Sequence, residues 1–214
     1  MSAIEIQLAG FGGQGVVLAG MTIGRGLALY EDYHVSLTQS FGPEARGSAC
    51  SVQLVVSLEP VLYPYLINPH ILVTMSQEAY RKFAPRLRPG GTLIIEEDLV
   101  RPDEVFRTPC PEGETRVQIH RVPAMRLAEE LGRKIVLNMV LVGFFTAVTS
   151  LLSPEAARKA VAESVPKGTE ALNLAAFEKG FSFGLSQAEC PVGSPQATSG
   201  ANHGSCGWAH ERES

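Results

Sequence analysis

The chain has 214 residues, a length typical of one domain with or without a tail. Its 18 basic and 22 acidic residues give a net charge of −4, which argues against a nucleic-acid partner. The sequence has no uninterrupted apolar run of the ~18 residues that a membrane span needs. From the first residues, which show no basic region followed by an apolar block, we expect no signal peptide, and the four cysteines form neither a CxxC pair nor an iron–sulfur array. We therefore expect a cytoplasmic protein without disulfides and without a membrane partner.

Apolar residues recur with the spacing of strands and helices along most of the chain. Residues 4–8 alternate apolar and polar side chains, which predicts a half-buried strand. Ser76 and Ser153 each precede a helical pattern and can cap it, and Pro154 suits the first position of the second helix. Strands are predicted at 4–8, 33–38, 49–57, 71–75, 92–95 and 115–119, and helices at 15–29, 76–87, 124–131, 138–152, 154–164 and 169–179.

This alternation of strands and helices predicts an α/β fold. We expect a single domain over residues 1–184, built as a three-layer α/β/α sandwich around a Rossmann-like, mostly parallel or mixed sheet. From Gly184 onward, Ser, Gly, Ala, Gln and Pro dominate, and the segment offers little apolar surface to offset the entropy of ordering. Residues 185–214 are therefore predicted to be a disordered tail.

A glycine-rich loop separates the first predicted strand from the first predicted helix. It reads Gly10-Phe11-Gly12-Gly13-Gln14-Gly15 and matches the GxGxxG pattern of dinucleotide-binding loops. Glycines permit a tight turn and a close backbone approach, and the N-terminus of the following helix offers free N–H groups to an anion. The loop therefore predicts a phosphate site. Alternatively, the glycines only let the strand, the turn and the helix pack closely.

The surroundings of the loop argue against a bound nicotinamide dinucleotide. That function needs an acidic residue at the end of the second strand, where it would hold the ribose hydroxyls. Here the second strand ends at residues 38–40, Thr-Gln-Ser, whereas Glu31 and Asp32 precede the strand. A stand-alone dinucleotide-binding oxidoreductase or binding protein remains an alternative, but it lacks this support.

A second loop, at residues 41–47, carries two opposite charges. Arg46 is suited to a phosphate or a carboxylate because its planar guanidinium can donate two parallel hydrogen bonds. Loops that follow neighbouring strands can meet at the carboxyl edge of a sheet, which would bring Arg46 near the glycine loop. Alternatively, Arg46 pairs with Glu44 or with a neighbouring subunit.

A metal site is not predicted. Cys190, His203, Cys206 and His210 follow no familiar zinc spacing and fall within the expected tail. No residue is assigned a catalytic role from the sequence.

The two loops together resemble a known family. The segments that carry the likeness are GFGGQGV at 10–16, SFGPEARG at 40–47, VQLVVS at 52–57, PGGTLI at 89–94, VPA at 122–124, NMVLVG at 138–143 and LNLAAFE at 172–178. They are similar to the gamma subunit of the 2-oxoacid:ferredoxin oxidoreductases. The resemblance covers residues 3–183 and leaves out the tail.

The resemblance implies a multi-subunit enzyme that decarboxylates a 2-oxoacid, reduces ferredoxin and forms an acyl-CoA. In this family, thiamine diphosphate with Mg²⁺ and the [4Fe–4S] clusters lie on partner subunits. The implied partners are alpha and beta subunits, a ferredoxin-like delta subunit in some complexes, ferredoxin and CoA. The chain itself is then non-catalytic and inactive alone, covers the active site and helps to bind CoA. A CoA phosphate would meet the loop residues Gly10, Gly12, Gly13, Gln14 and Gly15, or Arg46.

Within the family, some details are similar to the 2-oxoglutarate type. Ala45 stands where the pyruvate type often has a second arginine, and Tyr63-Pro64 also resembles the 2-oxoglutarate enzymes. Ser48 departs from the family, where a third glycine is common. The implied reaction forms succinyl-CoA and CO₂ from 2-oxoglutarate, or runs in reverse. Pyruvate or branched-chain 2-oxoacids are the alternatives.

Overall fold

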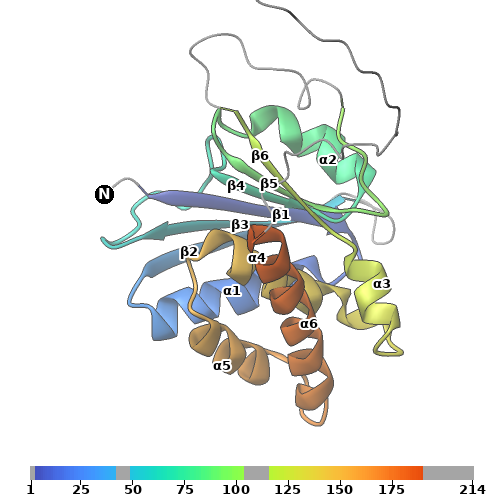
Figure 1. The fold of residues 1–214 in the computed structure, drawn as a ribbon. Coiled ribbons are helices and arrows are strands. Elements are labelled where there is room, and N and C mark those ends of the chain that lie inside the picture. Colours follow the sequence, from blue (N-terminus) through green and yellow to red (C-terminus); the bar gives the residue numbers. More distant parts are fainter. Residues whose placement is uncertain (1–2, 42–48, 104–115, 190–214) are drawn as a thin grey trace, which may run out of the picture.

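The computed structural model describes residues 3–41, 49–103 and 116–189 (Figure 1). Within these ranges a six-stranded sheet runs in the order β2-β3-β1-β4-β5-β6. The strands are β1 (Ile4–Phe11), β2 (His34–Phe41), β3 (Ala49–Ser57), β4 (Ile71–Thr74), β5 (Thr92–Glu96) and β6 (Gln118–Val122). The fold is therefore a single α/β domain with one sheet, as the alternating pattern predicted.

The sheet is mixed but mostly parallel. β3 is antiparallel to both of its neighbours, β1 and β2, whereas β1, β4, β5 and β6 pair in parallel. Five strands consequently run in one direction and only β3 opposes them. Their carboxyl ends, including the end of β1 that leads into the glycine loop, lie at the same edge of the sheet. This arrangement confirms the prediction of a mostly parallel or mixed sheet.

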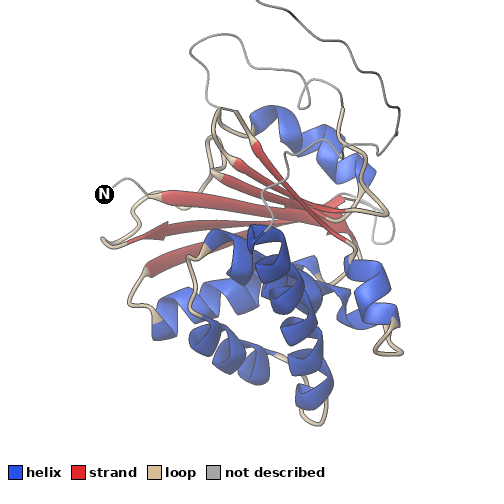
Figure 2. Cartoon of the chain, in the orientation of Figure 1, coloured by secondary structure: helices blue, strands red, loops and turns tan. Residues whose placement is uncertain are grey.

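Helices cover the two faces of the sheet unequally (Figure 2). The helices are α1 (Val16–Tyr30), α2 (Gln77–Phe83), α3 (Ala124–Glu129), α4 (Leu137–Thr149), α5 (Pro154–Ser164) and α6 (Glu170–Glu189), with 3₁₀ turns at Ala84–Arg86 and Lys134–Val136. Figure 1 shows α1, α3, α4, α5 and α6 on one face and α2 on the other. The core is divided accordingly into a large cluster under α1 and α4 and a smaller one under α2.

Helix α4 is the centre of the larger core. Ten of its consecutive residues, 137–146, are buried, because the sheet, α1, α5 and α6 surround it. Two glycines let α4 and α6 approach backbone to backbone. A Cβ atom on Gly143 would lie 2.0 Å from the Phe177 carbonyl oxygen, and one on Gly180 would lie 1.9 Å from the Val140 carbonyl oxygen. No side chain larger than hydrogen fits at either contact.

Several predicted boundaries differ from the structure by a few residues, and two of these errors have a clear physical reason. The last strand spans Gln118–Val122 instead of 115–119, because its parallel pairing with β5 buries Val122 completely. Helix α6 extends through Glu189, whereas a tail was predicted from residue 185. Gly184 contributed to that error, yet its missing side chain is what lets α6 pass α4: a Cβ atom there would lie 2.6 Å from the Ala147 Cβ. Residues 190–214 lie outside the described residues, so the rest of the tail stays a prediction.

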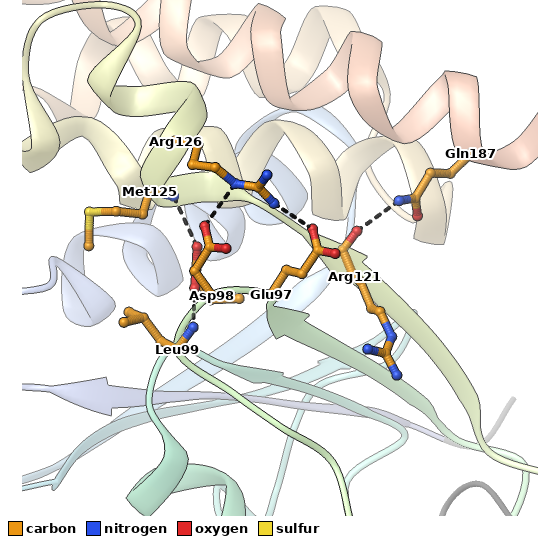
Figure 3. Close-up of polar contacts among 8 residues, drawn as sticks. Glu97, Asp98, Leu99, Arg121, Met125, Arg126 and Gln187 are labelled. Atoms are coloured by element: carbon orange, nitrogen blue, oxygen red, sulfur yellow. Dashed lines mark hydrogen bonds and ion pairs between the residues drawn. The ribbon is translucent and has the colours of Figure 1, made fainter.

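The end of α6 also covers one edge of the sheet. The Gln187 side-chain amide donates to the outward carbonyl of Arg121 on β6 at 2.9 Å (Figure 3). Among the described helices, none is both long and apolar enough to cross a membrane.

Candidate functional site

The glycine loop is held in a defined shape by Gln14. Its side-chain Oε1 accepts a hydrogen bond from the Phe11 N–H at 2.7 Å, and its Nε2 donates to the Met75 carbonyl at 2.9 Å. Gly13 and Gly15 adopt positive φ angles of 94° and 73°, which residues with a Cβ atom rarely tolerate. The amide of Gln14 is thus occupied within the fold, where it links the loop to the end of β4.

Gly15 lies against Asn138 at the start of α4. A Cβ atom on Gly15 would lie 2.4 Å from Nδ2 of Asn138. Asn138 is buried, its Oδ1 accepts from the Met139 N–H at 3.0 Å, and its Nδ2 lies 3.4 Å from the Gly15 carbonyl oxygen. This contact joins the loop to a helix more than 120 residues further along the chain.

Helix α1 begins directly after the loop without a side-chain cap. Gly15 is its N-cap residue and has no side chain to accept from the first turn, and that turn carries no acidic residue. The first N–H groups of a helix have no partner within it and carry the positive end of the helix dipole. The N-terminus of α1 therefore presents free donors to an anion.

A cavity of about 1070 Å³ opens beside the loop. Gly12, Gly13 and Gly15 form part of its wall, together with the first turns of α1, Cys50 and the segments around 133–138 and 166–173. The polar side chains in the wall come from Arg133, Asn138, Thr169 and Asn173, and the larger apolar ones from Phe11, Val17, Leu18, Met21, Ile135, Val136 and Leu172. The wall is therefore mostly apolar, with four polar side chains in it.

The charge of this cavity favours an anion. Arg133 is the one cation among the described residues of the wall, and none of those residues is acidic. Arg133 follows Gly132, which has a φ of 77° and turns the chain between α3 and α4. Together, the guanidinium and the α1 N-terminus suit a ligand with phosphate groups and an extended, less polar part.

Cys50 is the one thiol in the described part of the wall. It lies on β3 opposite Gly10 and is 7% exposed. Burial raises the pKa of the Cys50 thiol, so the protonated form dominates at neutral pH. A protonated, buried thiol is a poor nucleophile. The wall thus suits binding better than covalent chemistry.

The sequence-predicted site residues are only partly brought together. Gly12, Gly13 and Gly15 reach the cavity, whereas Gly10 lies within β1 and Gln14 turns into the loop itself. Arg46 and its proposed partner Glu44 lie outside the described residues. The cavity wall also contains residues that the sequence analysis did not single out as site residues, among them Arg133, Asn138, Thr169 and Asn173. Their separation of more than 110 positions from the loop left no local signal of proximity.

The acidic residues near the second strand do not form a ribose site. The carboxylate of Glu31 accepts from the Ser153 N–H at 2.9 Å and so secures the start of α5. Near the end of the strand, Gln39 and Ser40 are polar, uncharged and exposed. This geometry agrees with the argument against a nicotinamide dinucleotide.

A second polar cluster follows β5 (Figure 3). Glu96 is completely buried and accepts from the N–H groups of Leu99 at 2.7 Å and Met125 at 3.0 Å. Burial raises the pKa of its carboxyl group, against the opposing effect of these N–H donors. Beside it, Arg126 pairs with Glu97 at 3.0 Å and Asp98 at 2.9 Å. The cluster joins the turn after β5 to the start of α3 and has a structural role.

The fold and the site together define an α/β protein with a glycine-loop cavity suited to an anionic ligand. Its family is given by a match over residues 5–183 to the model described as pyruvate ferredoxin/flavodoxin oxidoreductase, and the chain belongs to that family. The family resemblance drawn from the two loops is thereby confirmed.

Individual relatives agree with this assignment. The chain is 45% identical over 178 residues to the 2-oxoglutarate synthase subunit KorC of Methanocaldococcus jannaschii, covering 83% of this chain and 91% of that protein. The gamma subunit of a keto/oxoacid ferredoxin oxidoreductase from Geobacter sulfurreducens is 33% identical, with a TM-score of 0.73 over 87% of this chain and 98% of that one. The 2-oxoglutarate:ferredoxin oxidoreductase of Magnetococcus marinus shares the fold, with a TM-score of 0.75 and 22% identity. In that enzyme the match covers 87% of this chain but only 32% of a longer polypeptide.

Proposed function

We propose that this chain is the gamma subunit of a cytoplasmic 2-oxoglutarate:ferredoxin oxidoreductase. The complex converts 2-oxoglutarate and CoA to succinyl-CoA and CO₂ while ferredoxin is reduced, or runs in reverse. The observation that carries the proposal is the 45% identity to a 2-oxoglutarate synthase subunit over 91% of that subunit's length. The glycine-loop cavity supports it, because its charge and shape suit a ligand such as CoA.

Within this complex, the chain helps to bind CoA and covers the active site, but it does not carry out the oxidation. Thiamine diphosphate with Mg²⁺ and the [4Fe–4S] clusters are proposed on the alpha and beta subunits and on a ferredoxin-like delta subunit where one is present. In this chain, the described cavity wall contains no histidine or carboxylate that could act as a general base, and its thiol is protonated. These features support a binding role.

The proposed ligand of the cavity is CoA. A phosphate group would accept hydrogen bonds from the N–H groups at Gly12, Gly13 and Gly15 and from the first turn of α1, with Arg133 supplying a counter-charge. Gly10 and Gln14 would shape the loop around it. The apolar part of the wall, including Ile135, would contact the less polar arm of the ligand. Arg46 stays a proposed phosphate ligand from the neighbouring loop.

An exposed apolar segment supports assembly with larger subunits. Between β3 and β4, five large apolar side chains are 54–94% exposed: Leu58, Leu62, Tyr63, Tyr65 and Ile67. The two tyrosine rings pack edge to face with centroids 5.6 Å apart. Clustered apolar exposure of this kind marks an interaction site. We assign this segment to contact with the alpha or beta subunit.

The test is an anaerobic affinity purification of the tagged full chain from its native cells. The eluate is assayed for CoA-dependent viologen reduction with 2-oxoglutarate, pyruvate and branched-chain 2-oxoacids. We expect brown protein with larger partners and a preference for 2-oxoglutarate. A preference for another oxoacid would refute the proposal that 2-oxoglutarate is the substrate. A colourless chain without partners that binds NAD(P) or FAD would refute the subunit role.

A further inference from the structure

One edge of the sheet lacks the features that usually prevent edge-to-edge pairing. β2 is the outermost strand at that edge, and it pairs with β3 over eight consecutive residues without a bulge. It contains no proline and no Asp, Glu, Lys or Arg, the residues that commonly prevent pairing at an exposed strand edge. At the opposite edge, Gln187 of α6 covers the outward carbonyl of Arg121. The two edges of the sheet therefore differ: α6 covers part of the β6 edge, whereas no described strand pairs with the outer side of β2.

The hydrogen-bonding direction of β2 follows from the sheet register. The Met75 N–H donates to the Ala9 carbonyl, so the odd-numbered residues of β1 bond to β4 and the even-numbered ones to β3. Successive residues of a strand bond to opposite neighbours, so the even-numbered residues of β3 bond to β1 and its odd-numbered residues bond to β2. The odd-numbered residues of β3 lie opposite the even-numbered residues of β2, so these are the β2 residues that bond to β3. Val35, Leu37 and Gln39 consequently present their backbone N–H and carbonyl groups outward, where no described strand pairs with them.

An apolar groove of about 300 Å³ runs along this same edge, between β2 and α1. Its lining is mostly apolar: Met21, Gly24 and Ala28 on α1 with Val35 and Leu37 on β2, joined by the polar residues Arg25 and Gln39. The Met21 side chain is 45% exposed. An edge strand beside an apolar groove is the arrangement that accepts an added strand, with alternate side chains of the newcomer inserted into the groove.

We infer that β2 pairs with β2 of a second copy of this chain, antiparallel about a two-fold axis near Leu37. This register places Leu37 opposite Leu37 of the other copy on the groove face. On the other face, Ser36 lies opposite Thr38 of the second copy, and His34 lies opposite Ser40. The strand is therefore complementary to itself at its centre, where Leu37 meets Leu37 and the hydroxyls of Ser36 and Thr38 meet. Towards its ends Val35 lies opposite Gln39, and no like charges oppose each other.

The size of this contact suits a dimer of moderate affinity. Eight strand residues span about 27 Å, and the strand layer together with the α1 layer is roughly 15–20 Å deep. Two such edges would bury about 800–1,100 Å² in total, near the ~1,000 Å² that a specific interface needs. The two exposed Met21 side chains would fill the joined grooves. A second copy therefore accounts for both the groove and the strand edge that no described strand pairs with.

The first test measures the mass of the purified full chain by light scattering and sedimentation velocity from about 1 to about 100 µM. We expect a dimer at the upper concentrations. Gln39→Pro removes an outward N–H without breaking a bond to β3, and Met21→Glu places two carboxylates in the joined grooves. Each variant should raise the dimer dissociation constant at least tenfold. Leu185→Glu changes a residue on α6 that is also 45% exposed and should leave the constant unchanged.

The second test traps the pair covalently, in the chain alone and in the assembled complex. The proposed register puts residue 36 of one copy opposite residue 38 of the other in a non-hydrogen-bonded pair, where Cα atoms lie about 4.5 Å apart and can be bridged. Under mild oxidation the double variant Ser36→Cys, Thr38→Cys should form a reducible dimer, and Ser36→Cys alone should not. Absence of this cross-link, a monomer at all concentrations, or an equal effect of Leu185→Glu would overturn the inference. None of these outcomes depends on which oxoacid the complex uses.

Discussion

The contact between Gly15 and Asn138 can be tested by adding a single methyl group. Gly15→Ala places a Cβ atom at a φ of 73°, where an L-residue costs roughly 1–2 kcal/mol. The new atom would also lie 2.4 Å from Nδ2 of Asn138, so this buried side chain must move. This movement would break the 3.0 Å hydrogen bond from the Met139 N–H to Asn138, which contributes about 1 kcal/mol to the stability of the fold. We expect a total loss of about 3 kcal/mol in the free energy of unfolding.

Two neighbouring glycines are matched controls for this variant. Gly13 has a φ of 94°, but a Cβ atom there would meet nothing within 4 Å, so Gly13→Ala carries the backbone strain alone. Gly12 also has open space at its Cβ position and has no positive φ angle, so Gly12→Ala should be nearly neutral. The expected order of destabilisation is Gly15→Ala, then Gly13→Ala, then Gly12→Ala.

The measurements are urea unfolding of the full chain and the apparent KM for CoA in the assembled complex. The difference between the Gly15→Ala and Gly13→Ala free energies isolates the contribution of Asn138. The proposed function adds that Gly15→Ala raises the KM for CoA more than the KM for 2-oxoglutarate. If Gly15→Ala were no more destabilising than Gly13→Ala, the proposed structural link between the loop and α4 would be refuted.

The remaining predictions concern the cavity, the buried carboxylate and the helix contact. Arg133→Ala and Arg46→Ala should each raise the apparent KM for CoA roughly five- to tenfold, with the KM for 2-oxoglutarate unchanged in steady-state kinetics; an unaltered CoA dependence removes that arginine from the site. Burial gives the folded state a Glu96 pKa above the unfolded value of about 4.3, so the folded state binds more protons between the two values and its stability falls as pH rises through that window. Glu96→Gln should abolish this dependence. In urea titrations at decreasing pH, the free energy of unfolding of the natural protein should therefore rise relative to that of the variant. The opposite trend would mean that the N–H donors lower the Glu96 pKa more than burial raises it. Gly180→Ala would put a methyl group 1.9 Å from the Val140 carbonyl oxygen and should cost more than about 3 kcal/mol, seen as a large fall in Tm; an unchanged Tm would mean that α6 shifts freely.

The order of strands and helices was predictable because it depends on local periodicity. The alternation over residues 4–8, the cap at Ser76 and the Ser153-Pro154 start of α5 all occur where the sequence analysis expected them. The Ser76 and Ser153 hydroxyls accept from the N–H groups of Ala79 and Ala156 at 3.2 and 3.3 Å. Propensity and capping act over a few residues, so a single sequence contains enough information to find them.

The misplaced boundaries have a different origin. The limits of β6 are set by its pairing with β5, and the length of α6 is set by packing against α4 and by the bond from Gln187 to β6. A composition argument treated Gly184 as evidence for disorder, although glycine also occurs where two helices meet closely. Both errors therefore come from contacts between segments far apart in the chain.

The candidate site divides in the same way. Sequence alone determined the family, the α/β class and the position of the glycine loop, because each depends on residues that are close together in the chain. Only the tertiary structure placed Arg133 and Asn138 beside that loop, turned Gln14 inward and left β2 without a second partner among the described strands. The physical reason is that a single sequence records spacing along the chain, whereas a cavity or an interface is made by packing between distant segments.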